Sequence, residues 1–558
     1  MKKGKTTGAR ALIKALESRG VEYIFGYPGG ATLPLYDELA KSSIKHILAR
    51  HEQGAAHMAD GYARASGKVG VCMATSGPGA TNLVTGIATA FMDSSPIIAI
   101  TGQVPRAMIG NDAFQEVDTT GITIPITKHN YLVKRASELP ATIEEAFYLA
   151  STGRKGPVLI DIPSDVQKEE FHLQEVKRKP LEGYKPTITG HPGQIRRAIQ
   201  QIKASKRPLI LAGGGIFHAD ATDELIELAE SGNFPIVYTL MGKASIPNSH
   251  RLCFGMIGYH GRVEANTAIS EADTIVAIGV RFSNRSTGKL QNFATQASII
   301  HIDIDPAEIG KNVPATLPIV GDAKHILAEL TKQLKKSNID GSKHEEWILH
   351  LASVRKKHPL RGRMEGVNTP NIIRKLKEVA GDIILVTDVG KHQMFAAHYF
   401  PVDTPRSFLT SGGLGTMGFS VPAAIGAKVA RPDKKVAVIA GDGSFFMTSQ
   451  QIASAVQYNI PVLILIMNDY CLGMIHQLQD VLYGKRYNAC DLERIVDYAK
   501  LAESMGAVGI RVTEEKDIES AISKGLESER PVVIDFILEE KENAYPMVVG
   551  DTLLDILE

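Results

Sequence analysis

The chain has 558 residues, of which 44% are hydrophobic and 22% are charged, and its formal net charge is +1. The composition is typical of a globular protein with several domains, and the near-zero charge gives no support for binding nucleic acid. No apolar run reaches the length of a membrane span, and the basic N-terminus leads into an amphipathic segment without signal-peptide features. We therefore expect a cytoplasmic enzyme that binds neither nucleic acid nor a membrane.

Four cysteines are scattered along the chain without CxxC spacing, at Cys72, Cys253, Cys471 and Cys490. Neither a disulfide framework nor a zinc site is therefore predicted.

Strands and helices alternate in the first part of the chain, which predicts a doubly wound parallel sheet. The expected strands are Glu22–Phe25, Ile44–Ala49, Val69–Ala74, Ile97–Thr101 and Pro157–Pro163, with helices over Leu33–Ala40, Gln53–Ala65 and Thr81–Phe91.

Two glycine-rich turns follow strands of this sheet, at residues 26–30 and 76–79. Both should lie at the carboxyl edge, where such sheets bind ligands, although neither matches a P-loop or a dinucleotide fingerprint. Each is either a tight turn or a ligand contact. Glu52 closes one strand and opens a helix, where a carboxylate either stabilises the positive end of the helix dipole or serves a ligand.

A second Rossmann-like sheet is predicted in the middle of the chain, after a charged, proline-containing stretch at residues 167–189. Its expected strands are Pro208–Ala212, Pro235–Thr239, Thr274–Val280 and Ile299–Asp303. The triple glycine after the first of them is not the GxGxxG pattern, so by itself it is weak evidence for a nucleotide.

The last domain begins near Asn368, after a charged, helix-prone segment that holds the only tryptophan, Trp347. A strand at Ile383–Thr387, a glycine-rich turn at residues 411–418, a helix at Val421–Val429, a helix at Ala502–Ala507 and a strand at Pro531–Ile537 are expected there.

The most informative stretch, residues 435–474, is a βαβ unit: a strand at Val436–Ala440, a helix at Thr448–Tyr458 and a strand at Val462–Met467. Right-handed crossover places the carboxyl ends of both strands on one edge, so Asp442 and Asp469 should lie together. Mg²⁺ binds hard oxygens from one or two carboxylates, phosphates and water. A lone Gly-Asp-Gly is more often a helix cap, but the acidic residue ending the next strand favours a magnesium–diphosphate site.

Together these patterns predict three doubly wound α/β domains, with linkers and a tail. The expected bounds are 1–167 (aminopyrimidine-binding), 168–190 (linker), 191–338 (central), 339–367 (linker), 368–540 (diphosphate-binding) and 541–558 (tail).

The stretch 435–474 resembles the thiamine-diphosphate motif, in which Gly-Asp-Gly is followed some two dozen residues later by Asn-Asn. The resemblance implies that Asp442, Asp469 and the main-chain carbonyl of Cys471 bind Mg²⁺. This chain has Asp469 where the motif has its second Asn, which exchanges one hard oxygen ligand for a more negative one. The further cofactor contacts implied in this domain are Val389, Gly390, His392, Gln393, Gly415, Met417, Gly441, Gly443 and Ser444.

The N-terminal segment GYPGGA…RHEQGAAHMADGYAR…ATSGPGATN resembles the aminopyrimidine-binding domain of the same family. By that resemblance Glu52 hydrogen-bonds N1′ of the pyrimidine ring. The resemblance adds cofactor contacts at Tyr27, Pro28, Pro78 and Asn82, and active-site residues at Gly30, Phe114 and Gln115. Without it, Gln115 would be read as a loop amide in water.

Segments of the middle domain, among them GMIGYHG, GVRFSNRSTGK and HIDIDPAEIGKN, resemble FAD-binding elements of acetohydroxyacid synthases. The implied flavin contacts are Arg154, Gly213, Gly214, Thr239, Leu240, Gly258, His260, Gly279, Arg281, Arg285, Asp303 and Asp322. Ser283 stands where that family commonly has Asp, so one polar contact with the flavin is expected to differ. The arginines suit a diphosphate, although a solvated basic face would look the same.

The resemblance to acetolactate (acetohydroxyacid) synthase catalytic subunits covers nearly the whole chain. It implies decarboxylation of pyruvate on thiamine diphosphate and ligation of the remaining two-carbon unit to pyruvate or 2-oxobutyrate, with FAD in a non-redox role. Met417 would bend the cofactor, although a methionine there could simply fill the core, and the carbonyl of Gly415 would bind the 4′-amino group. Leu478 stands where biosynthetic members usually have Trp, which predicts a weak preference for 2-oxobutyrate.

Three other functions are weighed. A FAD-dependent pyruvate oxidase would use the same two cofactors. A glyoxylate carboligase lacks the glutamate that Glu52 supplies, so the presence of Glu52 argues against it. A catalytically inactive homologue would not need Glu52, Asp442 and Asp469, so their presence argues against it as well. If Glu52 and Asp442 cannot meet within one chain, the cofactor lies at the interface of a homodimer or homotetramer, as in the resembled family. A separate small regulatory subunit is a further expected partner, although the sequence shows no docking surface for it.

Overall fold

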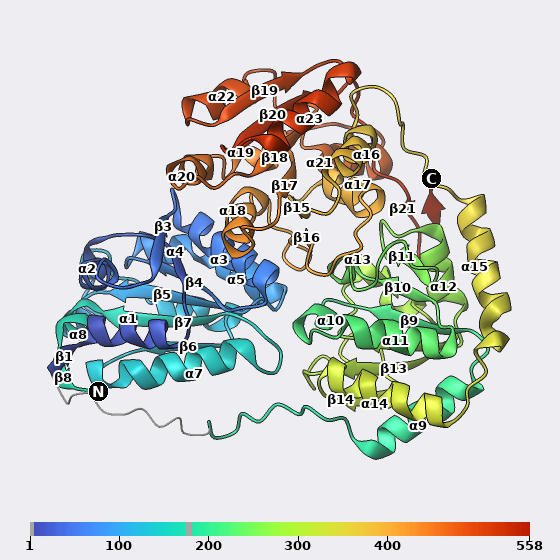
Figure 1. The fold of residues 1–558 in the computed structure, drawn as a ribbon, viewed down its shortest axis with the longest axis horizontal. Coiled ribbons are helices and arrows are strands. Elements are labelled where there is room, and N and C mark those ends of the chain that lie inside the picture. Colours follow the sequence, from blue (N-terminus) through green and yellow to red (C-terminus); the bar gives the residue numbers. More distant parts are fainter. Residues whose placement is uncertain (1–4, 174–180) are drawn as a thin grey trace.

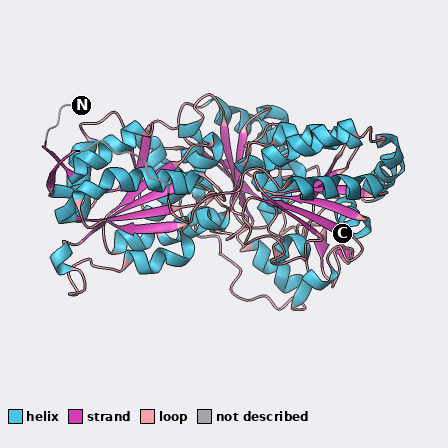
Figure 2. Ribbon diagram, turned by 90° about the horizontal axis from the view of Figure 1, so that it is seen from below, coloured by secondary structure: helices cyan, strands magenta, loops and turns pink. Residues whose placement is uncertain are grey.

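A computed structural model of the chain describes residues 5–173 and 181–558 (Figure 1). Three six-stranded sheets follow one another along the chain, and all of their strand pairs are parallel. Helices lie on both sides of the strands (Figure 2), which explains why the strands are continuous apolar runs rather than alternating ones. The predicted fold class, three doubly wound α/β domains, is confirmed.

In the N-terminal sheet, the two glycine-rich turns lie at the carboxyl edge, where β2 (Tyr23–Tyr27) and β4 (Gly70–Ala74) end. Its strand order is β3 (Lys45–Leu48), β2, β4, β5 (Ile97–Gln103), β7 (Val158–Pro163) and β6 (His129–Leu132). Its main helices are α1 (Gly8–Ser18), α2 (Leu33–Leu39), α3 (Glu52–Ser66), α4 (Pro78–Asn82), α5 (Val84–Met92) and α7 (Leu139–Ser151). The single helix expected over Thr81–Phe91 is wrong, because a short helix already starts at Pro78, where a proline at the first position suits a helix start.

The central sheet has the order β11 (Cys253–Met256), β10 (Ile236–Tyr238), β9 (Pro208–Ala212), β12 (Thr274–Ile278), β13 (Ser298–Asp303) and β14 (Leu317–Val320). Its longer helices are α9 (Pro192–Ala204), α11 (Thr222–Gly232), α12 (Val263–Glu271) and α14 (Ala323–Lys336). The segment expected as the second linker carries α15 (Glu345–Lys357), whose Trp347 is buried and donates a hydrogen bond to the carbonyl of Pro208 at 3.1 Å. This helix is therefore fastened to the central domain.

The C-terminal sheet has the order β16 (Phe408–Leu409), β15 (Ile384–Thr387), β17 (Val436–Gly441), β18 (Leu463–Asn468), β20 (Val532–Ile537) and β19 (Val508–Val512). Its helices are α16 (Thr369–Ala380), α17 (Lys391–Tyr399), α18 (Ser420–Ala430), α19 (Asp442–Phe446), α20 (Gln451–Gln457), α21 (Gly473–Leu482), α22 (Tyr498–Ser504) and α23 (Ile518–Glu527). The helix expected over Thr448–Tyr458 corresponds to α20, and a further short helix that was not predicted, α19, precedes it. Asp442 already starts α19, because the Ser444 hydroxyl accepts a hydrogen bond from the amide of Gly441 and caps the turn.

The N- and C-terminal domains pack together through α3 and α18 (Figure 1). Glycines allow the two helices to approach closely: a Cβ at Gly61 would lie 2.0 Å from the carbonyl oxygen of Ala423, and one at Gly426 would lie 1.9 Å from that of Met58. One hydrophobic core contains residues from both domains. This contact fixes the position of the N-terminal domain against the C-terminal domain.

Segments expected as a linker and a tail are folded. The strand β8 (Glu170–His172), at the start of the first linker, pairs antiparallel with β1 (Lys5–Thr7), and residues 174–180 lie outside the described residues. The last residues form β21 (Met547–Val548) and β22 (Ile556–Leu557), and the amide of Val548 donates to the carbonyl of Tyr259 at 2.8 Å. The C-terminal segment therefore covers the central domain. Among the described helices, none is long and apolar enough to cross a membrane.

Candidate functional site

A cavity of about 750 Å³ lies where the carboxyl edges of the central and C-terminal sheets face one another. Turns after β9, β10, β12 and β13 line one half of it, and turns after β15, β17 and β18 line the other. Loops at the carboxyl ends of parallel strands are where such sheets bind ligands. The two halves form one continuous cavity, lined on one side by turns of the central sheet and on the other by turns of the C-terminal sheet.

Asp442 and Asp469 lie together at the C-terminal end of this cavity. The strands β17 and β18 pair with Gly441 opposite Met467, which confirms that their ends share one edge. Asp442 accepts hydrogen bonds from the amides of Gly443 at 2.8 Å and Cys471 at 3.2 Å. Burial, and then the neighbouring charge of Asp469, raise the pKa of Asp442 to about 7. A divalent cation between the carboxylates would relieve this repulsion.

Glycines and one histidine shape the space beside this acidic pair. A Cβ at Gly441 would lie 3.0 Å from Nδ1 of His392, and one at Gly443 would lie 2.7 Å from the side chain of Leu472. The Nε2 atom of His392 is buried in the cavity wall without a hydrogen-bond partner in the described part of the chain. A phosphate oxygen is a suitable partner for such an atom. Val389, Gly390, Gln393 and Ser444 also line this part of the cavity.

Asp388 holds the glycine-rich turn in place, a role that the sequence did not reveal. Its carboxylate accepts hydrogen bonds from the amides of Gly418 and Ser420, both at 2.9 Å, and from the Ser420 hydroxyl at 2.6 Å. The turn then brings Gly415 (φ 72°) and Met417 to the cavity. Asp388 directly follows β15, at the same edge as the other site residues, and this position in the sequence could have indicated its role.

Most of the flavin-contact candidates line the central half of the cavity. These are Arg154, Gly214, Thr239, Leu240, His260, Gly279, Arg281, Arg285, Asp303 and Asp322. Gly213 and Gly258 do not line it but permit close packing, since a Cβ at Gly213 would lie 2.1 Å from the carbonyl oxygen of Gly279. Asp322 also caps α14, accepting a hydrogen bond from the amide of Lys324 at 3.0 Å.

The arginines of this half differ in their partners. Arg154 forms ion pairs with Glu308 at 2.7 Å and Asp305 at 3.3 Å. In the described residues the guanidinium groups of Arg281 and Arg285 have no ion pair, and Arg285 lies over the ring of Tyr259. Burial lowers the pKa of Arg281. Two guanidinium groups that form no ion pair in the described residues, both in a cavity wall, fit an anionic ligand such as a diphosphate.

The pyrimidine-binding candidates gather elsewhere, at the carboxyl edge of the N-terminal sheet. Glu52 is buried at the first position of α3, and its carboxylate accepts a hydrogen bond from the side-chain amide of Asn82 at 2.9 Å. The loop carrying Gln115 packs against Gly77, whose Cβ would lie 2.8 Å from the carbonyl oxygen of Gln115. Phe114 is 88% exposed. Gly30, Pro28, Tyr27 and Pro78 are exposed around the same edge.

None of these N-terminal candidates lines the cavity that contains Asp442 in the described part of the chain. The α3–α18 contact explains the separation, because it joins the two domains through helices rather than through their carboxyl edges. Leu478 is also absent from the cavity wall. It is half-buried on α21, one turn after Met474, which does line the cavity.

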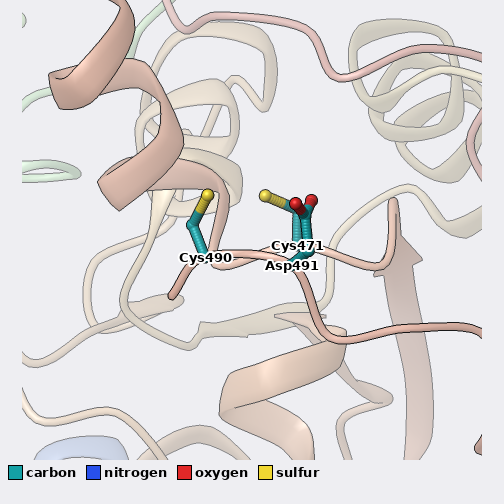
Figure 3. Close-up of side chains that lie close together, drawn as sticks. All are labelled: Cys471, Cys490 and Asp491. Carbon is teal, nitrogen blue, oxygen red and sulfur yellow. The ribbon is translucent and has the colours of Figure 1, made fainter. Parts of the chain in front are cut away.

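Cys471, Cys490 and Asp491 lie close together (Figure 3). Their sulfur and carboxylate atoms are within 4.8 Å of one another, because residues 470–472 pair with residues 490–492 as a short antiparallel ladder. Both cysteines are buried thiols, and Lys541 forms an ion pair with Asp491. Their wide spacing in the sequence gave no signal of this pairing.

Comparison with protein families agrees with this geometry. Residues 6–122 match the model of the thiamine pyrophosphate enzyme N-terminal TPP binding domain, residues 195–330 match that of the central domain, and residues 388–536 match that of the C-terminal TPP binding domain. The three matched regions follow the order of the three sheets along the chain, and the first of them ends before β6 and β7.

Curated relatives match over almost the whole chain. A probable acetolactate synthase large subunit of Methanococcus aeolicus is 49% identical, covering 99% of this chain and 95% of the relative. An acetolactate synthase of Mycobacterium bovis is 48% identical, with 99% and 91% covered. An acetolactate synthase large subunit of Haemophilus influenzae is 44% identical, with 98% and 96% covered.

Proposed function

Because this chain belongs to the thiamine pyrophosphate enzyme family, we infer that it is the catalytic subunit of an acetolactate synthase, which joins two pyruvate molecules into 2-acetolactate and CO₂. The observation that carries this inference is the pair of acidic side chains, Asp442 and Asp469, at the carboxyl ends of adjacent strands in one cavity. The cofactor supplies the electron sink for decarboxylation and carbon–carbon bond formation.

The protein's own residues hold and orient this cofactor. Asp442, Asp469 and the main-chain carbonyl of Cys471 would hold Mg²⁺, and the glycine backbone around them would hold the diphosphate. The carbonyl of Gly415 would accept a hydrogen bond from the 4′-amino group, and Met417 would support the bent cofactor. The carboxylate of Glu52 would hold a proton at N1′ of the pyrimidine ring. In the described part of the chain Glu52 does not line the cavity that contains Asp442, so this role requires another way to bring the two together.

A second copy of the chain would bring these halves together. Apolar side chains are exposed on the N-terminal domain that carries Glu52, namely Tyr27, Leu33, Phe114 and Ile124, and Phe446 and Met447 are exposed at the end of the helix that Asp442 starts. Exposed apolar side chains gathered at two half-sites are typical of an interface between subunits. We therefore assign the site to a homodimer in which Glu52 of one copy faces Asp442 of the other. The relatives named as large subunits suggest a separate small regulatory subunit in addition.

A mixing experiment tests the shared site. Glu52→Gln and Asp442→Asn homodimers should each be inactive, whereas dimers that exchange subunits contain one site with both wild-type residues. Complete exchange should restore about a quarter of the wild-type activity, because half of the dimers are mixed and one site in each is intact. Activity that stays at the level of the single variants after proven exchange would contradict the shared site.

FAD is the ligand that we propose for the central half of the cavity, on the evidence of Arg281 and Arg285. The protein purified with flavin should lose it in an Arg281→Ala/Arg285→Ala variant, measured by flavin absorbance after gel filtration. Arg207→Ala, at the surface of the same domain, is the control. Retention of flavin by the double variant would contradict this assignment.

The reaction is tested by incubating the protein with pyruvate, thiamine diphosphate and Mg²⁺, with and without FAD, and identifying the products. Acetolactate that accumulates while the flavin spectrum stays constant supports the synthase. Flavin that is reduced by pyruvate, without acetolactate, would show a pyruvate oxidase instead.

A further inference from the structure

A buried lysine touches one of the two metal-ligand candidates. The Nζ atom of Lys391 lies 2.5 Å from Oδ2 of Asp469, and the two side chains are only 8% and 4% exposed. Lys391 opens α17 directly after Gly390 and lines the same cavity as Asp442. The ion pair therefore lies inside the magnesium–diphosphate end of the site.

The backbone at Gly473 packs closely against the side chain of Lys391. A Cβ at Gly473, the first residue of α21, would lie 2.4 Å from Cε of Lys391. A side chain at that position would therefore displace the lysine stem. An ammonium group removed from water is stable only when it is paired, and Asp469 is the carboxylate that pairs with it in the described residues. The packing thus confines the ammonium to one place.

The charges of the three groups explain why the pair is needed. Asp442 and Asp469 contribute two negative charges where the thiamine-diphosphate motif has one Asp and one neutral Asn. The ammonium of Lys391 restores a net charge of −1, which suits a site that must hold a divalent cation together with an anionic diphosphate. One carboxylate oxygen of Asp469 faces the lysine, and the other remains available to a metal.

We propose that Lys391 is a positioning residue for the cofactor: it is the counter-charge that allows Asp469 to serve as a magnesium ligand without repelling the diphosphate. The inference rests on the proposed function and adds to it a residue outside the thiamine-diphosphate motif. Because Lys391 and Asp469 neutralise one another, replacing both should leave cofactor binding nearly unchanged, whereas replacing only one of them should alter it.

The test compares Lys391→Gln, Asp469→Asn and the double variant by calorimetric titration of the apoprotein with thiamine diphosphate. Two quantities are measured: the Mg²⁺ concentration that half-saturates binding, and the affinity for the diphosphate in EDTA. Lys391→Gln leaves an extra negative charge, so it should bind Mg²⁺ about tenfold more tightly and the diphosphate about tenfold more weakly. Asp469→Asn leaves an unpaired cation, so both shifts should have the opposite sign.

The double variant should return both quantities to within about threefold of the wild type, because removing both charges leaves the net charge of the site unchanged. Lys434→Gln is the matched control: Lys434 forms an ion pair with Asp382 in the same domain and does not line the cavity, so its removal should change both quantities much less. Shifts of the same sign in both single variants, or a double variant that stays as far from the wild type as either single variant, would overturn the inference. A wild-type protein that binds no thiamine diphosphate would overturn the proposed function as well.

Discussion

The carboxylate of Asp442 accepts a hydrogen bond from the main-chain amide of Cys471 at 3.2 Å, which ties the turn after β17 to the turn after β18. The two turns come from neighbouring strands, so a change in one is transmitted to the other. The magnesium-ligand candidates are therefore held by the sheet itself rather than by mobile loops.

Replacing Asp442 with Asn should abolish cofactor binding while preserving the fold. The amide oxygen can still accept the hydrogen bond from Cys471, but the charge that holds a divalent cation is lost, and acetolactate formation should fall by about a hundredfold or more. Calorimetric titration with thiamine diphosphate and Mg²⁺ measures the binding. Asp433→Asn, an exposed acidic residue of the same domain, should bind as the wild type does.

Replacing Glu52 with Gln should separate binding from chemistry. The amide can keep the contact with Asn82, so the cofactor should still bind, whereas loss of the carboxylate should lower the rate by about 10²–10⁴-fold. The rate of hydrogen–deuterium exchange at C2 of the bound cofactor measures this step directly. Glu22→Gln at the surface is the control, and normal exchange in Glu52→Gln would contradict the role.

Gly61→Ala should destabilise the contact between the N- and C-terminal domains. The added methyl group would lie 2.0 Å from the carbonyl oxygen of Ala423, so α3 and α18 must move apart, at a cost of about 1–3 kcal/mol. Urea unfolding measures the loss. Gly30→Ala is the matched control, since its Cβ meets nothing within 4 Å; an equal loss in both variants would show that the helix contact is not the cause.

The free energy of unfolding should depend on pH through Asp161. Burial raises the pKa of this carboxyl to about 7, while its side chain accepts hydrogen bonds from Thr101 and Gln103. Between about pH 4 and pH 7 the folded state therefore binds more protons than the unfolded state, and stability falls as the pH rises, by about 1 kcal/mol per pH unit. Asp161→Asn should flatten this slope in urea unfolding curves, whereas the exposed Asp37→Asn should not.

Leu478→Trp should change the choice of the second substrate. Because Leu478 continues the face of α21 that carries Met474 to the cavity, a larger ring there should favour 2-oxobutyrate over pyruvate as the acceptor. Competition between equal concentrations of both acids measures the ratio of products. Wild-type protein that already gives mostly acetohydroxybutyrate would contradict the weak preference that we predict for it.

The sheets and their edges were predictable because they depend on local patterns. Continuous apolar runs such as Val462–Met467 can only be buried strands, and the glycines and acidic residues that end them must then lie at the carboxyl edge. The βαβ unit at residues 435–474 therefore predicted that Asp442 and Asp469 meet. The short helices α4 and α19 were not predicted as separate helices, because a proline and a cap decide where they start.

The sequence by itself determined the three parallel sheets and the family motifs, since periodicity and turn residues act over short distances along the chain. Only the tertiary structure decided that Lys391 pairs with Asp469, that Cys471 lies beside Cys490, and that the C-terminal segment covers the central domain. These contacts join different elements, and no local pattern encodes which side chains meet across such distances. The packing of α3 on α18 likewise decided that, in the described part of the chain, Glu52 lies outside the wall of the cavity that contains Asp442.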